Sequence, residues 1–137
     1  MNVLFYLTPK AICSYVYSDF SIRQALERME SSGYATIPIL DRDGRYVGSL
    51  TEGDLLWAVK NLCGMDLKRT EGTGIMEITH RKDYAPVSVN TDIEDLVAKA
   101  VDQNYVPVVD DKESFIGIVT RRGILQHCLN TYIKDHK

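Results

Sequence analysis

The sequence has too few cysteines and clustered histidines for a disulfide framework or a metal centre. Its three cysteines, Cys13, Cys63 and Cys128, are odd in number and far apart. No Cys-x-x-Cys pair occurs, and the three histidines do not stand beside acidic residues at ligand spacing. We therefore expect no metal site, and this cysteine usage favours a reduced, cytoplasmic protein.

Long apolar runs and an excess of basic charge are also missing. No segment approaches the roughly 20 apolar residues that a membrane helix needs, and the apolar start of the chain lacks the basic residues of a secretory signal. The net charge of −3 argues against binding nucleic acid through an overall positive field. No grouping of acid, base and nucleophile is visible, so we expect neither an enzyme, a membrane protein nor a nucleic-acid-binding protein.

A short phrase occurs twice in the chain. Residues 48–56 read GSLTEGDLL and residues 117–125 read GIVTRRGIL, which share the frame Gly-x-x-Thr-x-x-x-apolar-Leu. The segments before them also match, with an apolar strand entered through Pro38 or Pro107 and then a polar turn and a second strand. A further strand is expected before each repeat, at residues 11–17 and 85–89. The pattern therefore predicts two strand-helix-strand-strand-helix units.

The first helix of each repeat has an apolar face and a start signal. Ser21 with Gln24, and Thr91 with Glu94, have the spacing of a capping box. Helical spacing then predicts which residues face the core. They are Ile22, Ala25, Leu26 and Met29 in the first repeat, and Ile93, Leu96, Val97, Ala100 and Val101 in the second.

These features resemble a tandem pair of cystathionine-β-synthase-type (CBS) domains, also called a Bateman module. The matching marks are the apolar-Pro-apolar strand and the following Gly-x-x-Thr-x-x-Asp frame, each present twice. The resemblance implies an α+β fold in which two β-α-β-β-α motifs pack as one pseudo-two-fold module. We expect motif 1 at residues 8–62, a linker at 63–75 and motif 2 at 76–135, with the basic run 80–82 as solvated surface.

The resemblance also implies a function. CBS pairs bind adenine nucleotides, usually dimerise and carry no chemistry of their own. The stretches GYATIPILD and GIVTRR are similar to small stand-alone bacterial members that bind cyclic di-AMP. We therefore expect a regulatory sensor for cyclic di-AMP first, and for AMP, ADP or ATP second, which forms a homodimer and signals to an unidentified protein. The alternative is a ligand-free homodimeric adaptor with vestigial pockets, which the loss of the motif aspartate at Gly123 favours.

The second copy of the phrase reverses the charge at its helix start. Thr51 and Asp54 have the spacing of a capping box, and the resemblance gives them a second role in binding phosphate and ribose. In the second copy Thr120 is followed by Arg-Arg-Gly at 121–123, which cannot complete a box. Two guanidinium groups at a helix N-terminus favour phosphate, although an arginine pair is also ordinary solvated surface. This helix start is expected to exchange ribose recognition for anion recognition.

The resemblance implies two clefts, each combining the proline strand of one motif with the helix start of the other. Apolar walls would stack on adenine while backbone groups read its edge. Alternatively, the strand residues are ordinary core residues, and Tyr34 and Tyr105 lie at the surface without contacting a ligand. Site A would comprise Ser14, Tyr34, Ala35, Thr36, Ile37, Pro38, Thr120, Arg121 and Arg122. Site B would comprise Tyr105, Val106, Pro107, Thr51 and Asp54, and Glu52 would make it the poorer phosphate site.

Overall fold

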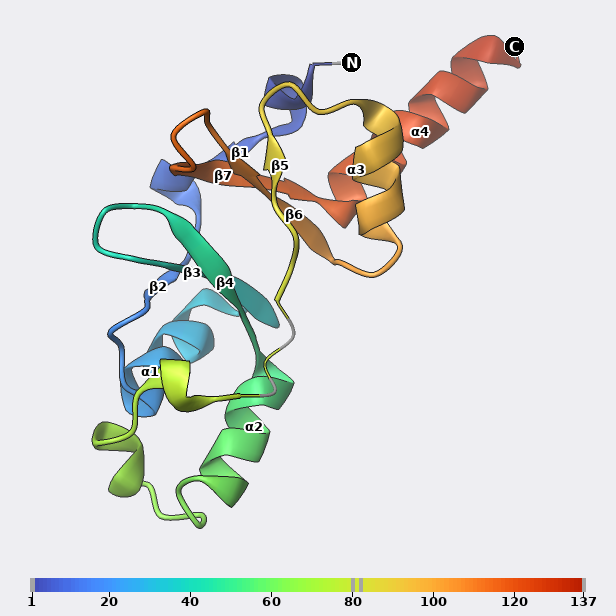
Figure 1. The fold of residues 1–137 in the computed structure, drawn as a ribbon. Coiled ribbons are helices and arrows are strands. Elements are labelled where there is room, and N and C mark those ends of the chain that lie inside the picture. The colour runs from blue at the N-terminus through green and yellow to red at the C-terminus, as the bar shows by residue number, and fades with distance from the viewer. Residues whose placement is uncertain (1, 80, 82, 137) are drawn as a thin grey trace. The chain divides into compact units, whose positions relative to one another are not determined.

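The computed structural model describes residues 2–79, 81 and 83–136, and its chain divides into two compact units (Figure 1). We call residues 14–83 unit N, and residues 84–137 together with 1–13 unit C. Each unit contains a β-sheet and two α-helices in the order strand-helix-strand-strand-helix. The expected α+β class and the repeated β-α-β-β-α order are therefore confirmed.

Unit N contains the first repeat. Its elements are β2 (Val16–Tyr17), α1 (Ile22–Ser32), β3 (Thr36–Leu40), β4 (Tyr46–Thr51) and α2 (Glu52–Asn61). Strand β3 lies between β2, to which it is parallel, and β4, to which it is antiparallel. The capping box of Ser21 and Gln24 is formed, and Ile22, Ala25 and Met29 are buried as the spacing predicts. The core joins α1, α2 and one face of the sheet.

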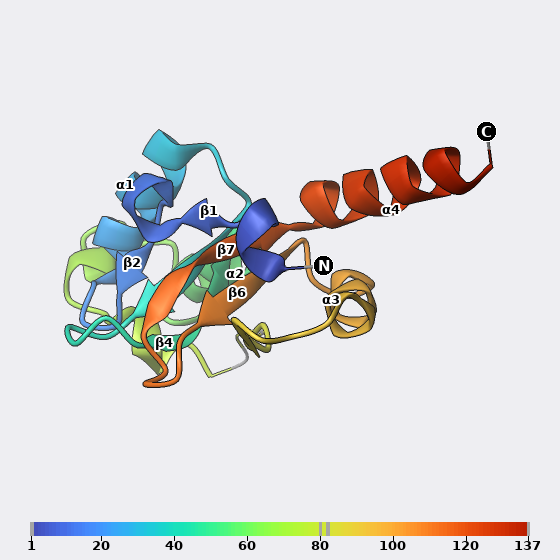
Figure 2. The same ribbon diagram turned by 90° about the horizontal axis from the view of Figure 1, so that it is seen from above.

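Unit C contains the second repeat and the N-terminal segment. Its elements are β5 (Val87–Ser88), α3 (Ile93–Ala100), β6 (Tyr105–Val109), β7 (Phe115–Thr120), α4 (Arg121–Asp135) and β1 (Thr8–Pro9). The sheet order is β1-β7-β6-β5, and its core includes Val3, Leu96, Val106 and Ile124. Figure 2 shows that the C-terminal half of α4 extends beyond the sheet of its own unit. In the described ranges no helix is both long enough and apolar enough to cross a bilayer.

The predicted capping box at the start of α3 was wrong. The N-cap is Asp92, one residue later, whose side chain accepts from the Asp95 backbone N at 2.9 Å. The Lys99 Nζ and the Thr91 hydroxyl each donate to the Asp95 carboxylate at 2.8 Å, which holds the pKa of Asp95 below its ordinary value. With Asp92 as the N-cap, the third helical residue is Asp95, so Glu94 does not stand at the position that would close a capping box.

The buried face of α3 is also narrower than the spacing predicts. Leu96 and Ala100 are buried, whereas Val97 and Val101 are exposed. Helix α3 ends at Ala100, so Val101 lies in the turn that follows it. The helix has only eight residues, and only a narrow apolar face of it packs against the sheet.

The strand expected at residues 11–17 is much shorter. Only Val16 and Tyr17 form β2, and residues 10–12 form a short 3-10 helix. The chain before it forms β1, in which Pro9 pairs with Gly117 of β7. This approach requires glycine, because a Cβ atom at Gly117 would overlap the Thr8 carbonyl oxygen. The N-terminal segment of the first repeat is thereby held in unit C.

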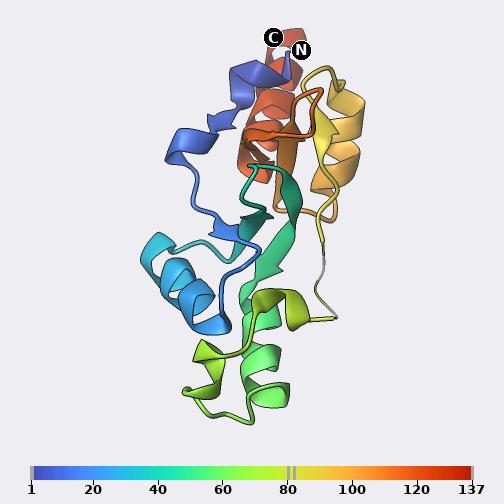
Figure 3. The same cartoon turned by 60° about the vertical axis from the view of Figure 1, so that its left-hand side comes forward.

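The segment that the sequence suggests as a linker is folded into unit N. It carries the 3-10 helix η3 (Arg69–Glu71) and ends where η4 (Ile75–Glu77) begins, and both short helices lie next to α1 and α2 in Figure 3. Cys63, Thr70 and Ile75 are fully buried. The Ile22 backbone N donates to the Thr73 carbonyl at 2.8 Å, so this segment also fixes the start of α1.

Candidate functional site

Within unit N, the start of β3 lies beside the start of α2. Thr36 pairs with Thr51 in the register of the sheet. The Glu52 backbone N donates to the Ala35 carbonyl at 2.9 Å, which ties the first residue of the helix to the loop before β3. The fold therefore brings residues assigned to site A next to Thr51, which was assigned to site B.

Unit C repeats this arrangement. Tyr105 pairs with Thr120, and the Arg121 backbone N donates to the Asn104 carbonyl at 3.0 Å. In both units, the strand start and the helix start of the same repeat are joined through one backbone bond and one register pair. The predicted sites combine contributions from different units, and that combination stays a prediction.

The start of α2 is a closed capping box. The Thr51 hydroxyl accepts from the Asp54 N at 2.9 Å, and the Asp54 carboxylate accepts from the Thr51 N at 2.9 Å. The capping role of these two residues is therefore confirmed. Glu52 and Asp54 place two carboxylates in the first turn, where they neutralise the field that would attract a phosphate group.

The start of α4 is open and positive. The Thr120 hydroxyl accepts from the Gly123 N at 3.0 Å, and no carboxylate lies in the first turn. Arg121 is half-buried and its Nε donates to the Gln103 carbonyl at 3.2 Å, whereas Arg122 is exposed. The helix N-terminus and two guanidinium groups act in the same direction, so of the two helix starts this one has the more positive field.

Ile37 and Val106 point their side chains into the cores of their units, whereas Pro38 and Pro107 lie on the opposite face of their strands. Ile37, Pro38, Val106 and Pro107 are buried, so only their backbone groups can meet a ligand. Ser14, just before β2, is half-buried.

Tyr34 and Tyr105, which the sequence interpretation places at matching positions in the two repeats, differ in their exposure to solvent. Tyr34 is 55% exposed, which agrees both with a wall of the ligand pocket and with ordinary protein surface. Tyr105 is 4% exposed and lies against Tyr84 with 5.0 Å between ring centroids, so its ring is part of the core of unit C.

One charged pair beside β4 was missed by the sequence interpretation. Arg81 was expected as solvated surface, yet its side chain is largely buried and its Nε donates to Asp83 Oδ1 at 2.9 Å. The same carboxylate oxygen accepts from the Ser49 N at 3.2 Å, close to Gly48, where a Cβ atom would overlap it. The motif glycine is the only sequence signal of this contact. His80 and Lys82, the other members of the basic run, lie outside the described residues.

Comparisons with known proteins agree with the repeat. A sequence profile described as the CBS domain matches residues 7–61 and 75–130. Cyclic di-AMP receptor B of Bacillus subtilis is 25% identical over 122 residues, which are 89% of this chain and 82% of that protein. The A-adding tRNA nucleotidyltransferase of Aquifex aeolicus is 30% identical over 109 residues, which are 77% of this chain. The chain spans only 12% of the length of that enzyme.

Solved structures share the fold over almost the whole chain. CbpB of Listeria monocytogenes, in complex with c-di-AMP, has a TM-score of 0.83 and 25% identity, with 98% of each chain covered. CBSX2, in complex with AMP, has a TM-score of 0.75 and 24% identity, with 96% of this chain and 98% of that chain covered. The similarity therefore extends over both repeats and over both units of the chain.

Proposed function

This chain belongs to the CBS domain family, and on that premise we propose that it is a non-enzymatic regulatory sensor of an adenine nucleotide, cyclic di-AMP first and AMP, ADP or ATP second. The observation that carries the proposal is the start of α4, a 15-residue helix with two arginines and no acid in its first turn. The similarity to proteins named for cyclic di-AMP supports this choice of ligand.

In this proposal, site A gives the phosphate groups and the base different partners. The guanidinium groups of Arg121 and Arg122, with the Thr120 hydroxyl, donate to phosphate oxygens. The backbone of residues 36–38 reads the adenine edge, because the side chains of Ile37 and Pro38 are buried. The exposed ring of Tyr34 stacks on the base. Site B has two carboxylates at its helix start and is the weaker phosphate site.

A thermal-unfolding panel tests the proposed function and separates it from the adaptor alternative. A ligand that binds the folded chain, at 100 times its dissociation constant, raises the free energy of unfolding by about 2.7 kcal/mol. The panel contains cyclic di-AMP, AMP, ADP and ATP, with GMP as a control. We expect cyclic di-AMP to give the largest rise in melting temperature. A chain that melts at the same temperature with every adenine nucleotide is an adaptor with vestigial pockets.

Base selectivity is expected because the adenine edge is read by fixed backbone groups. Guanine presents the reversed pattern of donors and acceptors, so buried backbone groups are left unpaired at a cost of ~1–3 kcal/mol each. Each unpaired group therefore weakens cyclic di-GMP relative to cyclic di-AMP by roughly 5- to 150-fold. Calorimetric titration of the two dinucleotides measures this ratio. Equal affinities would contradict a pocket in which the backbone reads adenine.

We further propose that the chain forms a homodimer and passes its bound state to a partner protein. The ligand can shift that partner only through its different affinities for two states of the sensor. Exposed leucines on the helices of both units, among them Leu56 and Leu129, support association through helical faces. Sedimentation velocity at micromolar concentration should give a species of twice the 15.5 kDa chain mass. A single species at the mass of one chain would contradict the dimer.

A further inference from the structure

Gln103 lies in the turn between α3 and β6 of unit C, and it is buried. The residue is 8% exposed, and in the described part of the chain only three polar residues are buried, namely Ser49, Thr70 and Gln103. A buried amide lowers stability unless its donors and its acceptor find partners. The partners of Gln103 therefore indicate what this residue does.

The side-chain amide of Gln103 joins two segments of unit C. Its Oε1 accepts from the Ala85 N at 3.0 Å, and its Nε2 donates to the carbonyls of Ala85 at 3.2 Å and Tyr105 at 3.3 Å. We call these three hydrogen bonds the Gln103 clamp. The Gln103 backbone N also donates to the Lys99 carbonyl at 2.9 Å, at the end of α3. The residue is thus fixed by α3, by the segment before β5 and by the start of β6.

The backbone carbonyl of Gln103 is directed to the start of α4. It accepts from the Arg121 Nε at 3.2 Å, and the neighbouring Asn104 carbonyl accepts from the Arg121 N at 3.0 Å. Arg121 is therefore held through both its main chain and its side chain. Within the described residues neither Nη group of Arg121 has a hydrogen-bond or ion-pair partner. These two groups form the end of the guanidinium that can bind two oxygens of one phosphate.

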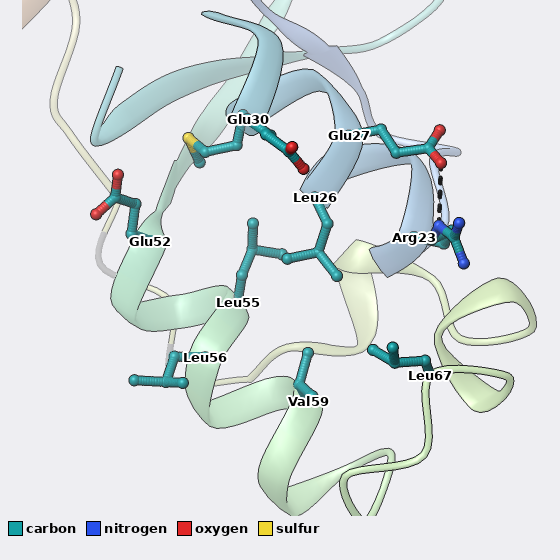
Figure 4. Close-up of a pocket in the computed structure, with 10 residues that line it drawn as sticks. Arg23, Leu26, Glu27, Glu30, Glu52, Leu55, Leu56, Val59 and Leu67 are labelled. Carbon is teal, nitrogen blue, oxygen red and sulfur yellow. Dashed lines mark hydrogen bonds and ion pairs between the residues drawn. The ribbon is translucent and has the colours of Figure 1, made fainter. Parts of the chain in front are cut away.

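The acceptor that holds Arg121 is uncharged, unlike the acceptors of other arginines in the structure. Figure 4 shows Arg23 in a groove lined by α1 and α2 of unit N, where its Nε donates to the Glu27 carboxylate at 3.0 Å. The Arg42 Nε likewise donates to the Asp19 carboxylate at 2.8 Å. A carboxylate partner offsets the positive charge of an arginine, whereas a carbonyl orients the side chain and leaves that charge available to an anion.

The first repeat has no equivalent clamp. Tyr34 and Gln103 each stand two residues before the strand residue that pairs with the motif threonine of their repeat. Tyr34 is exposed, whereas Gln103 is buried. The clamp is therefore present only beside the helix start that carries the two arginines.

We propose that Gln103 is a positioning residue of site A, whose clamp holds the carbonyl that orients Arg121 toward phosphate. This inference rests on the proposed function and identifies the residue that prepares its phosphate contact. Ordering a long side chain on binding weakens affinity, and a side chain that is held before the ligand arrives loses less freedom. Gln103 itself touches no ligand and acts only through Arg121.

A double-mutant cycle tests whether Gln103 acts through Arg121. Gln103→Met removes the amide and keeps a side chain of similar length. Affinity for cyclic di-AMP should fall by roughly 2- to 12-fold, which corresponds to the ~0.5–1.5 kcal/mol of ordering one long side chain. The same change should leave affinity unaltered in an Arg121→Ala chain and keep its full effect in an Arg122→Ala chain. Calorimetric titration measures all six chains, and melting curves verify that each is folded.

A spectroscopic measurement follows the positioning without any ligand. Nitrogen-15 NMR observes the Nε–H of Arg121, which is assigned by its absence in an Arg121→Lys chain. This proton should exchange with water more slowly than the Nε–H of the exposed Arg122, and Gln103→Met should remove the difference. The matched control is Gln24→Met, which removes an amide that accepts from the Ser21 N in the capping box of α1. The control should lose stability but keep both the affinity and the slow exchange.

Each result supports or overturns the positioning role. If Gln103→Met weakens binding equally in the parent, Arg121→Ala and Arg122→Ala chains, or leaves the parent unaffected, Gln103 does not act through Arg121. An Arg121 Nε–H that exchanges equally fast in the parent and in Gln103→Met would also overturn the proposal. A parent chain that binds no adenine nucleotide would contradict the proposed function, and the exchange measurement would still decide whether Gln103 holds Arg121.

Discussion

Replacing Arg122 by alanine is expected to weaken the binding of cyclic di-AMP by about 10- to 150-fold. A charge-assisted hydrogen bond to phosphate contributes ~1.5–3 kcal/mol, and this side chain is assigned to the phosphate groups in site A. Arg122 is exposed, so its removal should leave the free energy of unfolding within ~0.5 kcal/mol of the parent. Calorimetric titration measures the affinity, and a melting curve of the same sample verifies the fold.

Arg121→Ala should weaken binding by a similar factor but should also affect stability. Its Nε donates to the Gln103 carbonyl at 3.2 Å, and losing that bond lowers the free energy of unfolding by about 1 kcal/mol. Lys134→Ala removes one positive charge at the far end of the same helix and should bind nearly as the parent does. The Arg122 variant is therefore the cleaner probe of the phosphate contact.

Asp54→Ala distinguishes the two predicted sites. It opens the capping box of α2, which costs about 1 kcal/mol of stability, but it should hardly change the affinity for a ligand in site A. Suppose instead that both arginine variants bind as tightly as the parent and Asp54→Ala abolishes binding. The assignment is then inverted, and the ligand is a mononucleotide held through its ribose in site B.

Gly117→Ala is expected to lower the free energy of unfolding by about 2–3 kcal/mol. The added Cβ would overlap the Thr8 carbonyl oxygen and lie 2.9 Å from Leu7 Cδ1. Strand β1 pairs at this point with β7, and Val3, in the same N-terminal segment, is fully buried in the core of unit C. The substitution therefore displaces a strand and the packing that comes with it. Denaturant unfolding of the parent and the variant measures the loss.

A second glycine provides the matched control for this substitution. Gly53 lies in the first turn of α2, and the nearest atom to a Cβ placed there is the Thr51 Oγ1 at 3.7 Å. Gly53→Ala should therefore raise the free energy of unfolding by roughly 0.5–1 kcal/mol, since it restricts the unfolded chain and fits the helix. If Gly117→Ala unfolds at the same denaturant concentration as the parent, β1 does not pair with β7 in solution.

Periodicity and repetition predicted most of the secondary structure correctly. Residues that recur at helical spacing, such as Ile22 and Met29, are buried in the core. The strands predicted around Pro38 and Pro107 are the central strands β3 and β6, although each proline is the third residue of its strand and not the entrance to it. These features follow from local patterns of apolar residues, which is why sequence reasoning finds them.

Two kinds of feature were predicted wrongly from the sequence. One depends on contacts between residues far apart in the chain, and the other on a choice between neighbouring residues of similar capping preference. The pairing of Pro9 with Gly117 depends on a close approach that no local pattern encodes. The cap of α3 moved by one residue because Thr91 and Asp92 are both good capping types, and it is the Asp92 side chain that accepts from the Asp95 N.

The candidate site was predictable only in part. The charge difference between the starts of α2 and α4 is visible in the sequence, and the structure confirms it as two carboxylates against two arginines. The different exposure of Tyr34 and Tyr105 was not predictable, because Tyr105 is covered by Tyr84 from another part of the repeat. The combination of residues in site A rests on the family resemblance and stays a prediction.

Equilibrium dialysis of the parent chain against labelled cyclic di-AMP tests the central claim most directly. The account predicts saturable retention approaching one ligand per chain, displaced by unlabelled cyclic di-AMP and not by cyclic di-GMP. Retention should fall when Arg122 is replaced by alanine. Equal ligand concentrations on both sides of the membrane, with cyclic di-AMP and with AMP, would contradict the claim that this chain is a sensor of adenine nucleotides.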